Sequence, residues 1–373
     1  MVKIMTLQTK ITSALALAAV GFAAPAAAEL KYENQSGGSV KIYGQFSPAY
    51  QYFDDGAQSK STFVDNANSN SRVGLLLLQP YDQGSFSFKF ETAFGLRSSD
   101  AVTINTTPDG VSWSRSNLRH IDFAFDTNSY GKIYVGQGSM ATDGVAESDF
   151  SGTGMTTYVG ISDTAGSFAF RTSTGALSTV TIGDVISSLD GGRRGRVRYD
   201  SPTFSGFTVS VAAGQEILSQ TNSDDYYDAA LKYANDFGGT KVTGALGFSR
   251  RDLANGTKTE DTFGSAAVRL QSGLNFAFAA GSRKNDGDYT YIKAGYDATF
   301  FDFGETSFAI DYYNGNDFGL VGRKSKSMGI GVNQDIDSIS TQVYLGYREY
   351  ELSDPTVAYQ DASSILFGAR WKF

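Results

Sequence analysis

The side chains with the clearest chemical spacing are four arginines near the middle of the chain. Arg194, Arg196 and Arg198 occupy alternate positions, with Arg193 beside them. Residues two apart share one face of a β-strand, so three guanidinium groups would line one strand face, opposite Val197. Because guanidinium groups bind carboxylates and phosphates, this stretch predicts a strongly charged strand face.

Carboxylates gather just before these arginines, in the segment 138–192. This is the longest stretch without a clear strand pattern, and long connections in compact domains are usually functional or disordered. Phe168, Phe170 and Ile182 give the segment material to pack, which favours an ordered structure. Its acids are Asp143, Glu147, Asp149, Asp163, Asp184 and Asp190, and its one base is Arg171.

Composition excludes several kinds of catalysis. The chain has no cysteine and one histidine, His120, so a thiolate metal site, a cysteine nucleophile and a zinc site with two histidines are ruled out. His120 shares a strand face with Asp122, but a hydrolase would also need a nucleophilic serine beside them. The net charge of −8 argues against nucleic-acid binding. We expect no catalytic residues and no enzyme.

Two short acidic turns could bind Ca²⁺ through oxygen ligands. Neither has the spacing of a complete Ca²⁺-binding loop, so ordinary turns are favoured and no cofactor is expected. The two turns lie at 285–288 and 54–56.

The elements that would position these groups are strands, because apolar residues recur with a period of two. The pattern appears first after residue 39 and recurs to the end of the chain. From residue 40, Val40, Ile42, Gly44 and Phe46 alternate with Lys41, Tyr43 and Gln45. From residue 86, Phe86, Phe88, Phe90 and Phe94 alternate with Ser87, Lys89, Glu91 and Ala93.

Two kinds of connection separate the strands. Tight turns rich in Gly, Asn and Asp alternate with polar connections that are mostly longer, including 54–70, 97–117 and 138–192. Together they predict 16 antiparallel strands with short turns at one end and long loops at the other. The tight turns lie at 82–84, 128–131, 203–206, 235–239, 271–273, 301–304 and 335–338.

Residues 1–28 read as a cleaved export signal. Lys3 and Lys10 precede or border an apolar stretch that ends in three alanines before Glu29. The segment holds two lysines and no acid, so its removal changes the net charge from −8 to −10. We therefore expect one folded domain over 29–373.

No later apolar run approaches the roughly 20 residues of a membrane-spanning helix, so a membrane form would have to be a closed sheet. The polar strand faces carry Ser, Thr, Gly, Ala, Asn and Tyr rather than mostly Lys and Glu, which suits a wet barrel interior. A secreted soluble β-rich adhesin is the alternative. Aromatics near strand ends suit an interface belt, among them Tyr50, Phe53, Tyr233, Phe300, Tyr312 and Tyr313.

Two features break the pattern. Pro48 cannot donate a ladder hydrogen bond, so we expect a bulge or a local strand end there. Leu76 and Leu78 fall on the face that Arg72 would place inside the barrel.

At this point the sequence resembles the general diffusion porins of Gram-negative bacteria, in particular the alphaproteobacterial type. The resemblance covers the whole mature chain, although no single stretch is specific alone. The stretches that carry it are Val40-Lys41-Ile42-Tyr43-Gly44, Asn70-Ser71-Arg72-Val73-Gly74, Tyr130-Gly131-Lys132-Ile133-Tyr134-Val135-Gly136-Gln137, Arg196-Val197-Arg198-Tyr199-Asp200-Ser201-Pro202 and Trp371-Lys372-Phe373.

The resemblance implies a 16-stranded transmembrane barrel in the outer membrane that forms a homotrimer and lets small hydrophilic solutes diffuse through. It implies contacts with outer-membrane lipid and lipopolysaccharide. It also implies that the barrel assembly machinery reads the last strand, with Trp371 and Phe373 as the assembly signal. By position, segment 138–192 matches the family loop that folds into the barrel and narrows the pore.

Arginine on the lipid face costs about 2–4 kcal/mol near the membrane midplane, so we place the arginine row in the lumen. Acids on the loop would then face bases on the wall and set a field across the constriction. The net charge suggests a weak preference for cations, and a channel selective for a sugar or for phosphate is an alternative. The predicted basic wall residues are Lys41, Arg72, Lys89, Arg194, Arg196 and Arg198.

Overall fold

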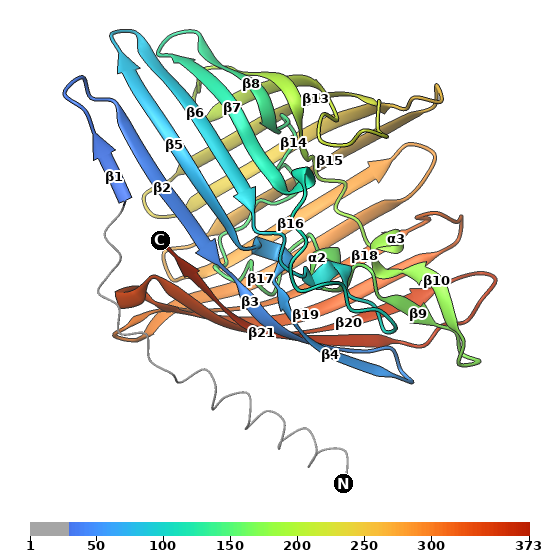
Figure 1. Ribbon diagram of the computed structural model, residues 1–373. Helices are drawn as coiled ribbons and strands as arrows, with labels where there is room; N and C mark the ends of the chain where they lie inside the picture. The colour runs from blue at the N-terminus through green and yellow to red at the C-terminus, as the bar shows by residue number, and fades with distance from the viewer. Residues whose placement is uncertain (1–29) are drawn as a thin grey trace.

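A computed structural model describes residues 30–373 (Figure 1). The expected export signal, 1–28, lies outside the described residues. Within the described part of the chain, no helix is long and apolar enough to cross a membrane.

Strands account for most of the described residues, and the few helices are single turns. The short helices are η1 (Ala67–Ser69), η2 (Ser99–Ala101), η3 (Arg115–Asn117), α2 (Ser162–Ala165), α3 (Ile182–Val185) and η4 (Asp337–Ile339). The strands are β1 (Leu30–Glu33), β2 (Ser39–Phe46), β3 (Pro48–Asp54), β4 (Ser59–Asp65), β5 (Arg72–Tyr81), β6 (Gly84–Ala93), β7 (Leu118–Thr127), β8 (Gly131–Ser139), β9 (Ala169–Arg171), β10 (Leu177–Thr181), β11 (Arg193–Asp200), β12 (Phe207–Gln215), β13 (Asp225–Asp236), β14 (Lys241–Asp252), β15 (Lys258–Arg269), β16 (Leu274–Arg283), β17 (Asp288–Phe301), β18 (Gly304–Asn316), β19 (Lys324–Ile336), β20 (Thr341–Ser353) and β21 (Ala362–Lys372).

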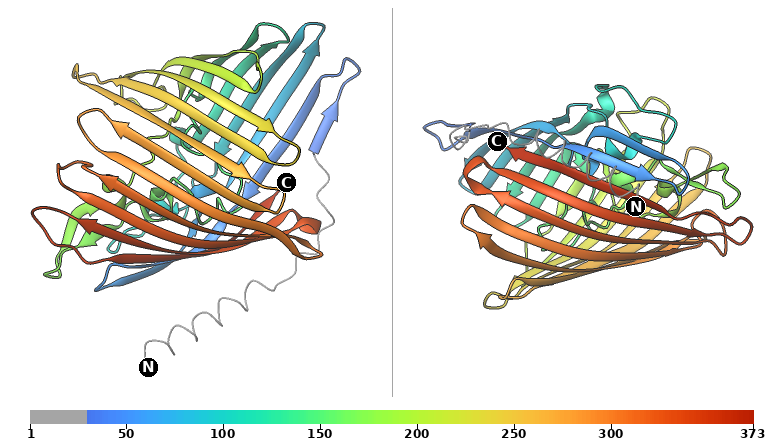
Figure 2. Two further views of the ribbon diagram at one scale, coloured as in Figure 1. Left: turned by 180° about the vertical axis from the view of Figure 1, so that it is seen from behind. Right: turned by 90° about the horizontal axis from the view of Figure 1, so that it is seen from below.

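The strands form a closed antiparallel barrel of 16 strands, which confirms the predicted fold. Its first strand consists of two pieces, β2 and β3, and its second consists of β4 and β5. From β5 onward each barrel strand pairs with the next one along the chain, and β21 closes the ring against β3 and the end of β2. The views from behind and from below show these strands tilted around one wall (Figure 2).

The first barrel strand is interrupted where the sequence predicted it. β2 ends at Phe46 and β3 begins at Pro48. Between them the backbone N–H of Ser47 donates to the hydroxyl of Ser71 at 2.8 Å. The connection predicted over 54–70 was partly wrong, because β4 occupies much of it and pairs with β3.

β1 lies on the same edge of β2 as β21. Leu30 pairs with Ile42, while Phe373 and Gly44 exchange backbone hydrogen bonds of 2.9 and 3.1 Å. The other edge of β2 is taken by β5. β1 therefore continues the line of β21 along β2.

The two faces of the wall differ as the alternation predicted. Phe278, Ile292 and Ile310 are about half exposed, at 49%, 55% and 50%, whereas their neighbours Ala279 and Tyr291 are buried. The exposed apolar residues form the outer surface that faces hydrocarbon in a membrane.

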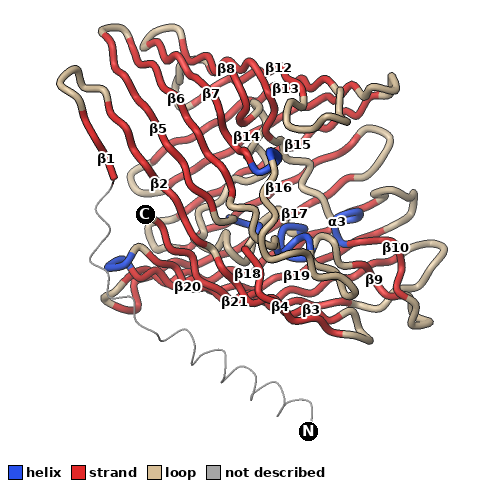
Figure 3. Tube along the Cα trace, in the orientation of Figure 1, coloured by secondary structure: helices blue, strands red, loops and turns tan. Residues whose placement is uncertain are grey.

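Part of the lumen holds an apolar core. Much of the loop 138–192 lies inside the ring of strands, whereas its hairpin of β9 and β10 lies at the end of the barrel (Figure 3). Its buried residues, including Ile161, Phe168 and Ile182, pack with Phe53 and Tyr350 of the wall. The loop therefore rests against one side of the barrel.

This packing corrects two predicted members of the aromatic belt. Phe53 is fully buried and its ring stacks on Phe168, with centroids 3.9 Å apart. Tyr313 is also fully buried, and its hydroxyl accepts from the backbone N–H of Ser187 at 3.0 Å. Both face inward because the loop gives inward aromatics something to pack on.

Leu76 does face inward, as the sequence suggested, and no register shift is involved. It lies between Lys41 and Lys89 in the ladder, and directly paired residues share a face. Long lysine side chains bury their aliphatic part against apolar neighbours, which accounts for a leucine at this position.

Candidate functional site

The candidate site is the inner surface of the barrel, and the wall holds the loop 138–192 there through inward-facing polar side chains. The carboxylate of Asp228 on β13 accepts from the backbone N–H groups of Ala141 and Thr142, at 3.1 and 2.8 Å. Lys293 on β17 is buried and pairs with Asp149 at 2.8 Å. These contacts fix the first half of the loop.

The second half is held near the long-loop end of the barrel. The strands β9 and β10 form a small hairpin within the loop. Arg171 on β9 forms a buried ion pair of 2.7 Å with Asp55, in the turn between β3 and β4. The backbone N–H of Gln360 donates to the carbonyl of Arg171 at 2.8 Å, so the hairpin also contacts the last loop.

Glycines in the wall leave room for the loop. A Cβ at Gly346 on β20 would lie 2.8 Å from Cβ of Thr156, and a Cβ at Gly247 on β14 would lie 3.0 Å from Cγ2 of Thr142. Contacts this close force one of the two groups to move, so small residues at these positions let the loop approach the wall.

We expect Gly346→Val to displace the loop from β20. Overpacking of this kind costs about 1–3 kcal/mol, and the loop can move only toward the open lumen, so single-channel conductance should fall. Heat denaturation of the folded barrel and bilayer recordings measure the two effects. Ala266→Val, on the exposed outer face of β15, is the matched control. An unchanged conductance in Gly346→Val would contradict this account of the loop.

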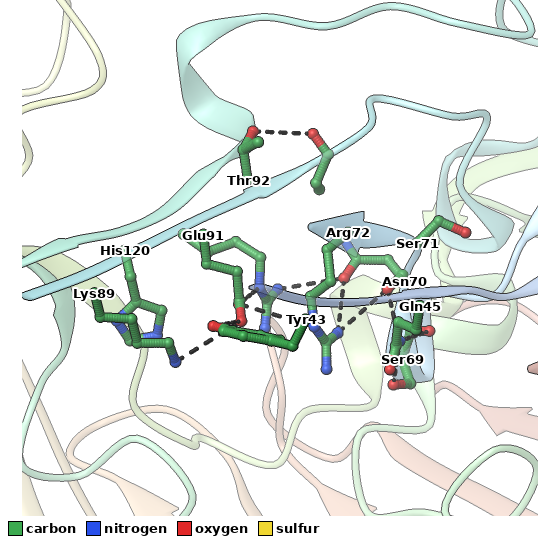
Figure 4. Close-up of polar contacts among 12 residues, drawn as sticks. Tyr43, Gln45, Ser69, Asn70, Ser71, Arg72, Lys89, Glu91, Thr92 and His120 are labelled. Atoms are coloured by element: carbon green, nitrogen blue, oxygen red, sulfur yellow. Dashed lines mark hydrogen bonds and ion pairs between the residues drawn. The ribbon is translucent and has the colours of Figure 1, made fainter. Parts of the chain in front are cut away.

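On the opposite wall, several side chains converge on Glu91 of β6 (Figure 4). Nε of Arg119 lies 2.6 Å from its carboxylate, and the Tyr43 hydroxyl donates to the same group at 2.8 Å. Arg72 and Lys89 follow at 3.8 Å each. Three cations thus surround one carboxylate on the inner face of β5, β6 and β7.

Of this cluster, Arg72 and Lys89 were predicted as wall bases, whereas Glu91, Arg119 and Tyr43 were not assigned a role. Glu91 stands two residues from Lys89, so alternation alone puts it on the same face. Lys41 lies on the same inner face as Tyr43 by this alternation. Arg193, also unassigned, forms an ion pair of 3.7 Å with a loop acid, Asp143.

The three arginines of the predicted row differ in their surroundings. Arg196 is buried, bonds Asp122 at 2.6 Å and donates to the backbone carbonyl of Gly136 at 2.9 Å, so it braces the wall. Arg198 forms a two-bond pair with Asp200, both bonds being 2.8 Å long. Arg194 stands 3.7 Å from its nearest carboxylate, Glu216.

The predicted acids also differ in position. Glu147 accepts a short hydrogen bond from the hydroxyl of Tyr158. Asp190 accepts backbone hydrogen bonds within the loop. Asp149 pairs with Lys293. Asp184 instead caps the short helix α3, where its carboxylate accepts from the backbone of Thr181.

Burial keeps protons on several of these loop acids. It raises the pKa of Asp163 to about 7, and the charges of Asp100 and Glu147 add to the effect. It raises the pKa of Asp190 to about 8, with a further contribution from Glu147. The pKa of Glu147 is also raised, mainly by burial. Near neutral pH these acids therefore carry less negative charge than their number suggests.

The predicted assembly residues lie together at the closing edge. The Trp371 ring is 5.1 Å from that of Phe373 and 6.0 Å from that of Phe46, between centroids. Phe94 also stacks on Phe46, at 5.2 Å between centroids. The chain end is therefore part of an aromatic cluster at the junction of the first and last barrel strands.

The histidine motif and the first acidic turn have partners that hold their side chains in the wall or the loops. Nδ1 of His120 contacts Asp122 at 3.2 Å, and within residues 30–373 no serine hydroxyl bonds the ring. Asp55 of the turn at 54–56 is occupied by Arg171. Among the described residues, no three His, Cys, Asp or Glu side chains are arranged to hold a metal ion.

The sequence pattern of the Gram-negative porin family matches residues 13–355. The chain belongs to the Gram-negative porin family. It is an outer-membrane β-barrel, and its function is a channel for passive diffusion. No curated protein matches this porin in sequence.

Solved structures with the same fold include the anion-selective porin from Comamonas acidovorans, at 16% identity and a TM-score of 0.59, covering 90% of this chain and 100% of that one. OmpF of Salmonella typhi, solved with daunomycin, is 14% identical with a TM-score of 0.53, covering 92% and 100%. A trimer form of OmpT of Vibrio cholerae is 16% identical with a TM-score of 0.55, covering 90% and 99%. At these identities the likeness concerns the fold.

Proposed function

We propose that the loop 138–192 narrows a water-filled pore between its own acids and the cationic wall around Glu91. The observation that carries this is the arrangement of Arg72, Lys89 and Arg119 around one carboxylate, on the side of the lumen opposite the packed half of the loop. Cations fixed on one side of a narrow passage, opposite a loop whose acids partly retain their protons, create a transverse field. Such a field orients dipolar solutes and disfavours apolar ones.

We also propose that this porin favours anions near neutral pH. The overall charge of −10 expected after export suggested cations, but charges are screened beyond about 8 Å at physiological ionic strength. The local charges therefore decide selectivity. Three cations against one carboxylate, together with loop acids that retain protons, leave an excess of positive charge at the constriction.

Selectivity should depend on pH. Asp163 and Asp190, with pKa values near 7 and 8, lose their protons as the pH rises, so the anion preference should weaken between pH 6 and pH 9. Reversal potentials across a KCl gradient measure the change. Asp190→Asn should remove the upper part of the transition, and a pH-independent reversal potential would contradict the role of the loop acids.

The assembly that fits this chain best is a homotrimer in contact with outer-membrane lipid and lipopolysaccharide, inserted by the barrel assembly machinery. The exposed apolar wall and the trimer form of the Vibrio relative support this proposal. Native mass spectrometry of detergent-purified protein tests it. We further propose that the protein has no enzymatic activity, because His120 has a carboxylate partner but no adjacent nucleophile among the described residues.

The proposed pore is tested directly by planar-bilayer recording. Purified protein should give large, ohmic conductance steps, and the rate of solute entry into liposomes should fall with increasing solute size. A barrel that inserts but does not conduct would contradict the proposal.

A further inference from the structure

A polar cavity lies apart from the Glu91 cluster. It has a volume of about 340 Å³ and is bounded by the end of the loop, 186–192, and by the strands β11 and β13 to β16. This volume is at the lower end of the range of about 300–1,000 Å³ that small-molecule sites occupy. Residues from both sides line it, including Arg194, Tyr226, Arg251, Asp261 and Arg283.

The charges of this cavity are mostly neutralised in pairs. Arg283 forms two hydrogen bonds with Asp261, at 2.8 and 2.9 Å. Nε of Arg251 lies 2.7 Å from Asp224. Each guanidinium group carries five N–H donors, so pairing with a carboxylate leaves donors available. The cavity offers both donors and acceptors with little free charge.

Arg194 is the exception, because its pairing is incomplete. Its guanidinium lies 4.1 Å from the centre of the Tyr226 ring, and that of Arg251 lies 5.6 Å from the same ring. Its nearest carboxylate, on Glu216, is 3.7 Å away. Within residues 30–373 its buried Nε has no hydrogen-bond partner. Nη1 of Arg194 donates to the backbone carbonyl of Arg193 at 2.5 Å, so the tyrosine ring and this bond hold the guanidinium group beside the cavity without a close carboxylate.

The loop side of the cavity adds further polar groups. Asp190 lines it, and its two carboxylate oxygens accept from the backbone N–H groups of Gly144 and Ala146 at 2.8 and 2.7 Å. Ser187 and Ser188 line the same side. Serine hydroxyls donate and accept hydrogen bonds, so this side also lacks a dominant charge.

We propose that this cavity is a binding subsite for a neutral, hydroxyl-rich solute the size of a mono- or disaccharide. Each hydroxyl of such a solute donates to a carboxylate and accepts from a guanidinium, which is the combination that paired arginines and acids present. An inorganic anion gains less here, because carboxylates already occupy three of the four arginines that line the cavity, Arg250 being paired with Asp252 at 2.6 Å. The inference rests on the proposed pore, since the solute reaches the cavity from the lumen.

The test uses the full-length protein in planar bilayers with sucrose as the probe. Reversible sucrose binding should add noise to the open-channel current. Arg194→Gln should raise the half-blocking concentration about tenfold, as expected for the loss of hydrogen bonds from a charged donor. Arg323→Gln is the matched control, because Arg323 pairs with Asp354 at 2.9 Å and does not line the cavity. The control should bind sucrose like the unchanged protein.

Three results would overturn the proposal. If the channel conducts but sucrose adds no noise to its current, the proposed subsite is refuted and the proposed pore is not. An equal rise of the half-blocking sucrose concentration in Arg194→Gln and Arg323→Gln would show that sucrose does not bind in the cavity. Block by inorganic phosphate, dependent on Arg194 and without an effect of sucrose, would make the cavity an anion site. An inserted barrel without conductance would instead refute the proposed pore.

Discussion

Replacing Arg72, Lys89 and Arg119 together by glutamine should reverse the ion selectivity of this porin. The three substitutions remove every cation that contacts Glu91 within 4.0 Å in the described structure, and the carboxylate then sets the local charge. A change of about 1.4 kcal/mol in the local energy of an ion is a factor of ten, so we expect the chloride-to-potassium permeability ratio to fall about tenfold. Reversal potentials in a KCl gradient measure it.

The matched control removes the same net charge elsewhere. Lys258, Lys284 and Lys324 are exposed residues near the long-loop ends of β15, β16 and β19. Their replacement by glutamine should change the permeability ratio little, because screening hides them from the constriction. Equal shifts in the two triple variants would show that overall charge, rather than the Glu91 cluster, controls selectivity.

Deleting Phe373 should reduce the amount of folded barrel in the outer membrane more than any single exposed substitution. The deletion removes both backbone hydrogen bonds with Gly44 at the closing edge, and it removes a ring from the cluster with Trp371 and Phe46. Removing a large buried aromatic costs about 3–5 kcal/mol, which is an upper bound for this partly exposed ring. Heat-modifiable mobility on gels quantifies the folded barrel.

Two further variants separate the role of Phe373 in closing the barrel from its role as a residue read by the assembly machinery. Phe300→Ala removes an exposed aromatic away from the closing edge and should leave the yield unchanged. Phe373→Ala keeps the backbone bonds, so it should refold in detergent but assemble poorly in cells if the machinery reads the ring. Normal assembly of both Phe373 variants in cells would contradict the predicted assembly signal.

Alternation made the barrel predictable, because lipid on one side and water on the other impose opposite demands on successive residues. β4 was missed because it lacks this alternation. Its sequence, Ser-Lys-Ser-Thr-Phe-Val-Asp, has only two consecutive apolar residues, and it lies at the long-loop end, beyond the region where alternation is required. Tertiary pairing with β3 defines it instead.

The site was only partly predictable. Alternation placed Arg72 and Lys89 inside, but their convergence on Glu91 depends on the register between three strands. The same limit explains Arg196, whose partner Asp122 comes from a strand far earlier in the chain. Burial of the loop acids depends on how the loop packs, so the sequence showed six carboxylates without showing which of them retain protons.

The alignment of β1 with β21 along one edge of β2 has a consequence for folding order. The ring closes between β21 and the much earlier strands β2 and β3, so a growing chain cannot complete it before β21 has been made. Contacts so distant in sequence carry a high loop-closure entropy and form slowly. Until β21 has been made, this edge of β2 stays open to intermolecular pairing, which makes the unfinished chain prone to aggregation. Covering this edge of β2 until β21 pairs with it therefore protects the chain from aggregation.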